Sequence, residues 1–476
     1  SEAAALENPV AAFIEAAIWH GTLETAEAIL AAHQEIARAS IHVAAILGDD
    51  AAVRRFIAAD PRNVTKKEAP YDGDALVYLC LSKYLRLDKT RSDAFMRAAT
   101  ALLDAGADPN TGFTAKDEYG DFETALYGAA AVAQHAKLTR LLLERGADPN
   151  EVEIPYHVPE SYDNATLKVL VESGKLNADS LTTMLLRKAD IHDYDGIKYL
   201  LEHGADPNRM TRWHYTALHQ AVRRDNRIEL IDLMLDHGAD PTLKNEADGK
   251  SAIAMAARRG RSDVLWTFAR RGFPMPMLYD GVEHLIVSVC AARGGVAGAR
   301  AFAEQFQLAR LPKSGERLAV SKVMATSGLV AIRELLAEGN TLLAEFAGNG
   351  NTKGVQNLLD IGVPVDALYD GDPYFDIAKN STALHVAAWK AWPKTVKLLI
   401  ERGANVNAQD AKARTPLMLA VKACVDSHWM NRRSPESVDA LLKAGASISG
   451  LDFPCGYTEV DELLQQYASN STANAR

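Results

Sequence analysis

A short helix-ending phrase recurs through the chain at a nearly fixed interval. Its glycine supplies the left-handed residue that ends a helix, and the Asp, Pro and Asn that follow favour a turn. Glycines 34 residues apart, as from Gly204 to Gly238 and on to Gly272, leave room for a turn and two antiparallel helices. A repeat of this length predicts a stacked array rather than one closed core. The phrase reads Gly-Ala-Asp-Pro-Asn at 106–110, 146–150 and 204–208, with close variants at 238–242 and 403–407.

A second phrase follows the first in a constant phase. Leu218 comes fourteen residues after Gly204, and Leu417 comes fourteen residues after Gly403. The Thr or Ser that begins this phrase predicts the N-cap of a short helix, and its small Ala residues allow the next helix to approach closely. Further copies lie at 124–130, 251–257 and 382–388.

With these two phrases in phase, the chain resembles the ankyrin repeat family, and its length resembles the long arrays of bacterial type. The resemblance implies an all-α solenoid of about 13 helix-turn-helix repeats. It also implies β-hairpin fingers, some of them extended, and a concave surface formed by fingers and first helices. The resemblance further implies that the side chains of His219 and His385 form structural hydrogen bonds between repeats.

The consensus is uneven along the chain. Residues 151–178 are short of a full first helix. We therefore expect N-terminal repeats over 1–276, degenerate repeats with a candidate hinge over 277–361, C-terminal repeats over 362–468 and a disordered tail over 469–476.

Composition narrows the class of partner and the compartment. The net charge of −10 disfavours nucleic acid, and the sequence has no apolar run long enough to cross a bilayer. The four cysteines are scattered without a CxxC pair, which favours a reducing compartment. We expect a cytoplasmic monomer. Because residue 1 is Ser, a secreted effector or a chain exported after signal removal remains an alternative.

The excess acid lies in four segments where the repeat pattern predicts fingers. Residues 60–74, 111–123, 151–164 and 367–381 together carry a net charge of −10, the same as the whole chain. Tyrosine and phenylalanine are interleaved with these acids, and tyrosine provides rigid contact area with a polar tip. The phrase YDGD occurs in two of the segments. A calcium loop is disfavoured at the second copy, because Phe375 stands where the loop needs glycine and no Glu occupies the twelfth position. At the first copy the run ALVYLC after Asp74 predicts the start of an apolar helix instead.

These patterns predict a partner-binding surface, although Asp and Gly are also ordinary turn residues and each tyrosine could simply cover a neighbouring finger. The predicted partner-binding residues are Tyr71, Asp72, Asp74, Tyr119, Asp121, Phe122, Tyr127, Tyr156, Tyr162, Trp213, Tyr215, Tyr279, Asp280, Tyr369, Asp370, Asp372, Tyr374 and Trp389.

The sequence contains no nucleophile elbow, phosphate loop, HExxH or dinucleotide fingerprint, so we expect no catalytic, cofactor-binding or metal residues. The first hypothesis is a non-enzymatic scaffold that binds a partner protein or a basic peptide. The second is a small-molecule binding protein or a hydrolase-type enzyme that uses the carboxylates and aromatic rings. The third is a bacterial effector or a toxin-neutralising protein.

Overall fold

The computed structural model describes residues 7–117, 119–258, 261–273, 339–350, 352–360, 362–427, 429 and 432–474. The chain divides into two compact units. The N-terminal unit consists of Ser1–Lys188 and Lys198–Asp206, and the C-terminal unit consists of Ala189–Ile197 and Pro207–Arg476.

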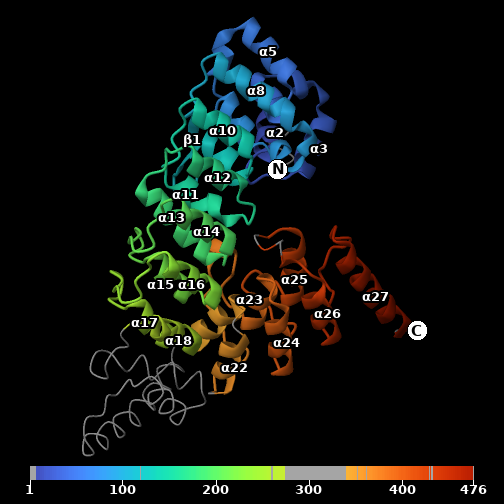
Figure 1. Cartoon of the computed structure of the whole chain (residues 1–476). Helices are drawn as coiled ribbons and strands as arrows, with labels where there is room; N and C mark the ends of the chain where they lie inside the picture. The colour runs from blue at the N-terminus through green and yellow to red at the C-terminus, as the bar shows by residue number, and fades with distance from the viewer. Residues whose placement is uncertain are drawn as a thin grey trace, which may run out of the picture. The chain divides into compact units, whose positions relative to one another are not determined.

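The N-terminal unit is built from pairs of short helices joined by turns (Figure 1). Helices α2, α4, α6 and α9 contact one another in succession and form one layer, while α5, α8, α10 and α12 form the second layer. The α-helices are α2 (Pro9–Ala17), α3 (Leu23–Ala32), α4 (Ile41–Leu47), α5 (Asp50–Ala59), α6 (Ala75–Leu81), α7 (Lys83–Leu87), α8 (Ser92–Asp104), α9 (Ala125–Tyr127), α10 (Ala136–Glu144), α11 (Glu153–His157), α12 (Ala165–Glu172) and α13 (Ala178–Asp190). The short elements are the 3₁₀ turns η1 (Gln34–Arg38), η2 (Pro61–Val64), η3 (Lys89–Arg91) and η5 (Val158–Glu160) and the π-helical turn η4 (Gly128–Val132).

The C-terminal unit repeats this two-layer arrangement. Helix α15 packs on α17 and α16 on α18; farther along the chain, α23 packs on α25 and α24 on α26. Leu384, Leu399, Leu417 and Leu441 are fully buried in one core between the layers formed by α23 to α26. The elements are α15 (Ala217–Arg223), α16 (Ile228–Asp236), α17 (Ala252–Arg258), α18 (Ser262–Arg270), α22 (Thr352–Asp360), η6 (Pro373–Phe375), α23 (Ala383–Trp389), α24 (Pro393–Glu401), α25 (Pro416–Val425), α26 (Glu436–Lys443) and α27 (Thr458–Asn474); α14 (Tyr194–Glu202) belongs partly to each unit.

The helix ends follow the chemistry expected from the sequence. Gly204 has a φ of 97°, and a Cβ added there would meet nothing within 4 Å, so the backbone conformation rather than crowding requires glycine. At the start of α15 the Thr216 hydroxyl accepts the His219 N–H, and the His219 Nδ1 accepts the Thr216 N–H. The His219 Nε2 donates to the Leu243 carbonyl at 2.8 Å. The predicted structural role of this histidine is confirmed, and His385 repeats it with Arg414.

The asparagine that ends each Gly-Ala-Asp-Pro-Asn phrase links its repeat to the next. Asn208 donates from Nδ2 to the Gly238 carbonyl at 2.8 Å and accepts the Asp240 N–H at 2.8 Å. Asn110, Asn150 and Asn407 make the same pair of bonds, each to a carbonyl and to the amide two residues farther on. We call this series the asparagine ladder. Within each compact unit it fixes the spacing of the neighbouring repeats that it joins.

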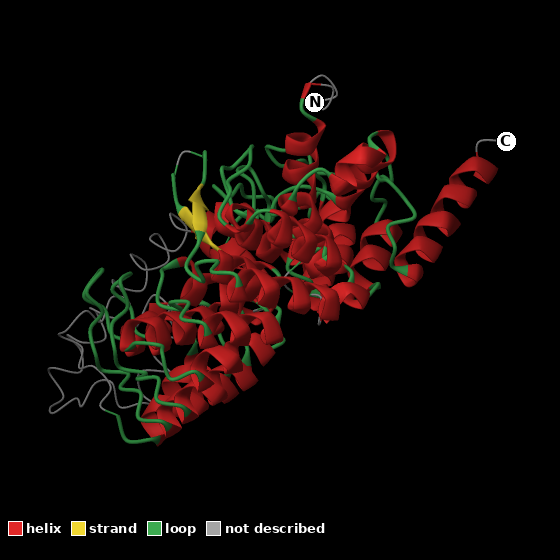
Figure 2. Cartoon of the chain, turned by 90° about the horizontal axis from the view of Figure 1, so that it is seen from above, coloured by secondary structure: helices red, strands yellow, loops and turns green. Residues whose placement is uncertain are grey.

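The described residues form one two-stranded sheet, which Figure 2 shows as the yellow hairpin. Strands β1 (Gly112–Thr114) and β2 (Phe122–Thr124) are antiparallel, with Phe113 opposite Glu123. Other inter-repeat segments form isolated bridges, such as Tyr369 with Ser381. The count of about 13 repeats stays a prediction, because the predicted hinge region 277–361 lies largely outside the described residues.

Two local predictions have clear outcomes. The short first helix in 151–178 is confirmed, since α11 has five residues. The disordered tail is wrong for residues 469–474, because α27 continues to Asn474. Val460 and Leu464 bury the start of α27 in the core, and a helix that is already nucleated gains one hydrogen bond with each residue added.

Candidate functional site

Two contacting segments that precede first helices, and a third that contains the first helix α11, belong to successive repeats of the N-terminal unit. We call residues 66–74, 111–124 and 151–162 the N-terminal finger surface. The Tyr71 ring stacks on Phe113 with centroids 5.0 Å apart, and Trp19 meets both rings edge-on. Lys116 donates from Nζ to the Pro70 carbonyl at 2.7 Å. The predicted residues that lie in these three segments are Tyr71, Asp72, Asp74, Tyr119, Asp121, Phe122, Tyr156 and Tyr162.

The first YDGD copy closes a turn onto α6. Asp74 is 6 % exposed, caps α6 by accepting the Val77 N–H at 3.1 Å, and accepts the Thr111 hydroxyl at 2.6 Å. The Tyr78 hydroxyl accepts the Gly73 N–H, and burial raises the pKa of this phenol to about 12. The prediction that Asp74 contacts a partner is wrong for the described conformation, since the side chain is buried and holds two fingers together. Asp72, in contrast, is exposed.

The hairpin tip presents apolar side chains to solvent. Tyr119 is 75 % exposed and Phe122 is 52 % exposed. Asp117 accepts the Tyr119 and Gly120 N–H groups at 3.0 Å, which folds the tip, and Asp121 is exposed beside them. Large exposed apolar groups rimmed by charge are typical of interaction sites.

Two glutamates below this tip have carboxyl groups that are incompletely bonded. Glu123 is 4 % exposed, and its Oε2 makes no hydrogen bond with any described residue; the same holds for Glu151 Oε1. Burial, with the charges of Glu153 and Asp121, raises the pKa of Glu123 to about 7. Burial also raises the pKa of Glu151 to about 8, against a hydrogen bond from the Thr124 hydroxyl that lowers it. At pH 7 Glu151 is therefore largely protonated and Glu123 is about half protonated.

The next first helix carries a separate ion network that is internally satisfied. His157 contacts Glu153 through Nε2 at 3.0 Å and Glu160 through Nδ1 at 2.8 Å. Burial would lower the pKa of His157, but the two carboxylates outweigh it and raise the pKa to about 9. Arg187 donates to Glu160 at 3.0 Å and covers the Tyr156 ring, 4.3 Å from its centroid. Tyr156 is thus packed rather than fully open.

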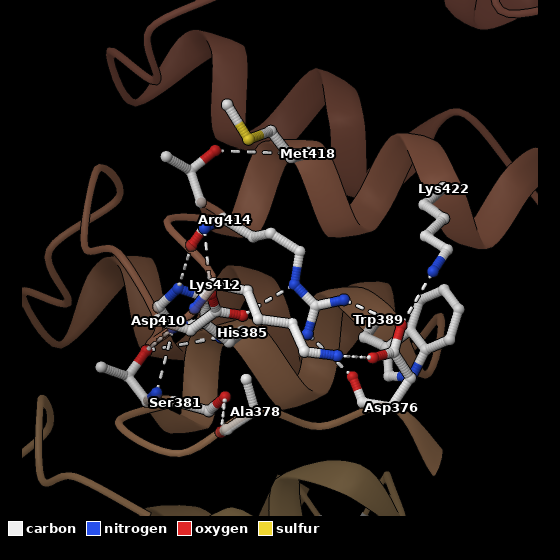
Figure 3. A network of polar contacts seen from close by, with 12 residues as sticks. Asp376, Ala378, Ser381, His385, Trp389, Asp410, Lys412, Arg414, Met418 and Lys422 are labelled. Carbon is white, nitrogen blue, oxygen red and sulfur yellow. Dashed lines mark hydrogen bonds and ion pairs between the residues drawn. The ribbon is translucent and has the colours of Figure 1, made fainter. Parts of the chain in front are cut away.

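A second network holds the long segment 367–381 of the C-terminal unit (Figure 3). Asp376 receives Lys412 at 2.7 Å and both Arg414 and Lys422 at 2.8 Å, and Arg414 also donates to the Asp376 carbonyl. Burial would raise the pKa of Asp376, but the three cations outweigh it and hold the pKa well below its usual range. Its backbone is left-handed, with φ of 57°. These bonds tie segment 367–381, which the sequence predicts to be a finger, to the next repeat; we call it the latched finger.

The second YDGD copy lies within that latched finger and differs in conformation from the first. Asp372 caps the 3₁₀ turn η6 by accepting the Tyr374 N–H at 3.2 Å, while Asp370 is exposed. Trp389 is 4 % exposed, and its indole donates to the Phe375 carbonyl at 2.6 Å. The prediction of Trp389 as a contact residue is wrong for this conformation, because the ring fills the core under the finger.

The remaining predicted residues are dispersed. Tyr127 is buried and receives a hydrogen bond from Trp19, which removes it from the surface. Trp213 and Tyr215 are partly exposed in another segment, where Arg212 and Arg223 cover their rings. Tyr279 and Asp280 lie outside the described residues.

The sequence prediction did not single out Glu123, Glu151, His157 or Asp376, although all four lie within or at the end of the acidic segments. The net negative charge of these segments indicated that they contain many acids. It does not show which of those acids form hydrogen bonds or ion pairs within the folded chain.

Within the described ranges, no helix is both long and apolar enough to span a bilayer. The same residues contain no group of three or more His, Cys, Asp or Glu side chains arranged for a metal ion.

Comparison with known proteins identifies the repeats. A model of ankyrin repeats in three copies matches residues 184–274, 319–410 and 343–452, and a single ankyrin repeat model matches residues 121–153. Together these ranges cover more than half of the chain.

Individual relatives match only in part. The ankyrin repeat and KH domain-containing protein mask-1 of Caenorhabditis elegans is 24 % identical over 226 residues, covering 46 % of this chain and 8 % of that protein. Protein glp-1 of Caenorhabditis elegans is 25 % identical over 344 residues, covering 69 % and 22 %. The human ASB11 ankyrin repeat domain, known from a crystal structure, is 27 % identical and covers 49 % of this chain and 98 % of that domain, with a TM-score of 0.37.

The chain spans less than a quarter of the length of the two curated relatives, and a bacterial origin stays a prediction. The matched repeat models, the phased glycine and threonine phrases and the two-layer helix packing agree: the chain belongs to the ankyrin repeat family.

Proposed function

We propose that the chain is a non-enzymatic interaction scaffold whose N-terminal finger surface binds a basic segment of a partner protein. Ankyrin repeats generally bind proteins, which supports the class of function. The observation that carries the proposal is the hairpin tip, where the exposed rings of Tyr119 and Phe122 lie beside Asp117 and Asp121. Apolar area provides affinity, and the acids favour a partner of opposite charge.

The latched finger of the C-terminal unit supports this assignment to the N-terminal fingers. Asp376 already has three cationic partners from its own chain, so its charge is neutralised internally. Asp117 and Asp121 have no ion pair with any described residue closer than 4.0 Å. The hairpin tip therefore keeps the negative charge of these two aspartates for a partner.

Selection from a random peptide library displayed on phage tests the proposal. We expect the full chain to enrich peptides with excess lysine and arginine, and Phe122→Ala to weaken their binding by about tenfold, the loss typical of a modest contact hot spot. Leu87→Ala is the matched control, since Leu87 is 59 % exposed on α7. Enriched peptides without excess positive charge, or equal loss in both variants, would contradict the proposal.

A hydrolase-type role is the second candidate, because the pKa of Glu123 near 7 suits a general acid or base. Chromogenic esters and glycosides provide the test. Turnover that disappears in Glu123→Gln would favour catalysis, and absence of turnover in the wild-type chain would remove this candidate.

We extend the proposal to a monomer in the cytoplasm. Sedimentation of the purified chain tests the first part, and imaging of the tagged chain in its source cell tests the second.

A further inference from the structure

We infer that Glu123 and Glu151 form a receptacle for the side-chain cation of one lysine or arginine of the partner. The inference rests on the proposed function and names one contact within it. It starts from two neighbouring carboxyl groups that each leave a buried oxygen without a hydrogen bond to any described residue.

The fold places both carboxyl groups at one junction. Glu123 lies on β2, and the next residue, Thr124, hydrogen bonds through its hydroxyl to Glu151 of the following repeat. The Thr124 hydroxyl also accepts the Tyr127 N–H at 3.0 Å, so it is held in place by the first turn of α9. A charged oxygen left buried without a partner is costly, and a buried acceptor without a donor marks a place where one is missing.

The nearby cations of the described residues are already engaged. His157 lies between Glu153 and Glu160, and Arg187 donates to Glu160 and to the Tyr156 carbonyl. Lys116 is bonded to the finger 66–74.

Most of the groups that face the receptacle are acids: Asp117 and Asp121 of the hairpin, Asp148 after α10 and Glu153 of α11. The phenol of Tyr127 on α9 and the imidazole of His157 on α11 also face it. Apart from His157, none of them supplies a positive charge. An incoming ammonium or guanidinium group is therefore the complementary occupant.

In the free chain, bound protons neutralise the carboxyl groups of Glu123 and Glu151 in place of a cation. At pH 7 Glu151 is largely neutral and Glu123 is about half neutral, because burial and neighbouring acids raise their pKa values. A bound cation lowers these values again, so binding must release protons. Glu151 is partly exposed as a residue, although its unbonded oxygen is buried like that of Glu123, so a cation from solvent reaches the pair from the Glu151 side.

Calorimetry with a defined probe measures this release. Acetylated and amidated hexalysine is titrated into the full chain at pH 7 in two buffers of different ionisation enthalpy. We expect about one proton released per bound chain, and affinity that rises between pH 6 and pH 8 while the lysines stay charged. Glu123→Gln and Glu151→Gln should each reduce proton release and weaken binding at pH 8 by about tenfold.

Controls separate the inference from the proposed function. Glu144→Gln changes an exposed glutamate of α10 and should leave proton release unchanged. Hexalysine that binds without proton release, and equally well to both receptacle variants, overturns the inference but leaves the proposed function intact. No binding in any buffer overturns both. Thermal stabilisation of the chain by Ca²⁺ or Mg²⁺ alone, lost in Glu123→Gln, would assign the receptacle to a metal ion and overturn the inference. Circular dichroism of each variant verifies folding.

Discussion

Replacing Glu123 by glutamine should make the chain more stable, and increasingly so as the pH rises. Glutamine has nearly the shape of a protonated glutamate but never ionises. In the folded chain Glu123 is buried with one oxygen unbonded to any described residue, so ionisation is resisted there and not in the unfolded chain.

The pKa sets the size of the effect. The folded value is about 7, against an ordinary value of 4.5. A group whose pKa is raised on folding favours the folded state fully below its unfolded pKa, and this stability is lost as the pH rises through the folded pKa. At about 1.4 kcal/mol per pH unit, the wild-type chain loses about 3 kcal/mol between pH 4.5 and pH 8. Glutamine avoids this loss.

Urea unfolding followed by circular dichroism from pH 5 to pH 8 is the assay. We expect Glu123→Gln to exceed the wild-type free energy of unfolding by about 1 kcal/mol at pH 5 and about 3 kcal/mol at pH 8. The attraction of His157 for an ionised Glu123 is already contained in the pKa of about 7, and His157 stays largely protonated up to pH 8, so its other contributions cancel in the difference. Parallel curves for variant and wild type would refute the reasoning, and Glu144→Gln supplies the baseline.

Three further changes probe other contacts. Asp376→Asn removes the anion held by three cations, so limited proteolysis of segment 367–381 should be about fivefold faster, an effect of about 1 kcal/mol, whereas the exposed Asp370→Asn should leave the rate unchanged. Asn208→Ala removes both rungs of one step of the asparagine ladder and should lower the free energy of unfolding in urea by about 1–2 kcal/mol; an unchanged midpoint would count against the ladder. Gly128→Ala places a Cβ 2.8 Å from the Cys80 backbone and should lower the free energy of unfolding by about 1–3 kcal/mol, seen as a reduced melting temperature, with no reduction contradicting this close packing.

The repeat architecture could be predicted because its signals are local. Gly204 ends its helix through its own backbone conformation, and Thr216 caps α15 three residues before His219. Such signals need no knowledge of distant contacts. The helical conformation of the C-terminal tail could not be predicted from local signals, because α27 is anchored by burial of Val460 and Leu464 against other repeats.

The candidate site was harder because each acid depends on partners far away in sequence. Asp74 is engaged by Thr111, 37 residues later, and Asp376 by cations 36 to 46 residues later. Whether these groups meet depends on finger length and helix packing. The total charge of the fingers was readable, but the division between bonded acids such as Asp376 and exposed acids such as Asp121 was not.

The asparagine ladder has a consequence for how such a chain can change over evolutionary time. Its rungs join residues separated by 36, 25, 30 and 38 positions at Asn110, Asn150, Asn208 and Asn407, yet each makes the same two bonds. The contact between two neighbouring repeats is thus the same whether many or few residues separate the bonded positions. Insertions and deletions in the predicted fingers can accumulate without displacing the next repeat. The surface that binds a partner can therefore diversify while the asparagine contacts between repeats are inherited unchanged.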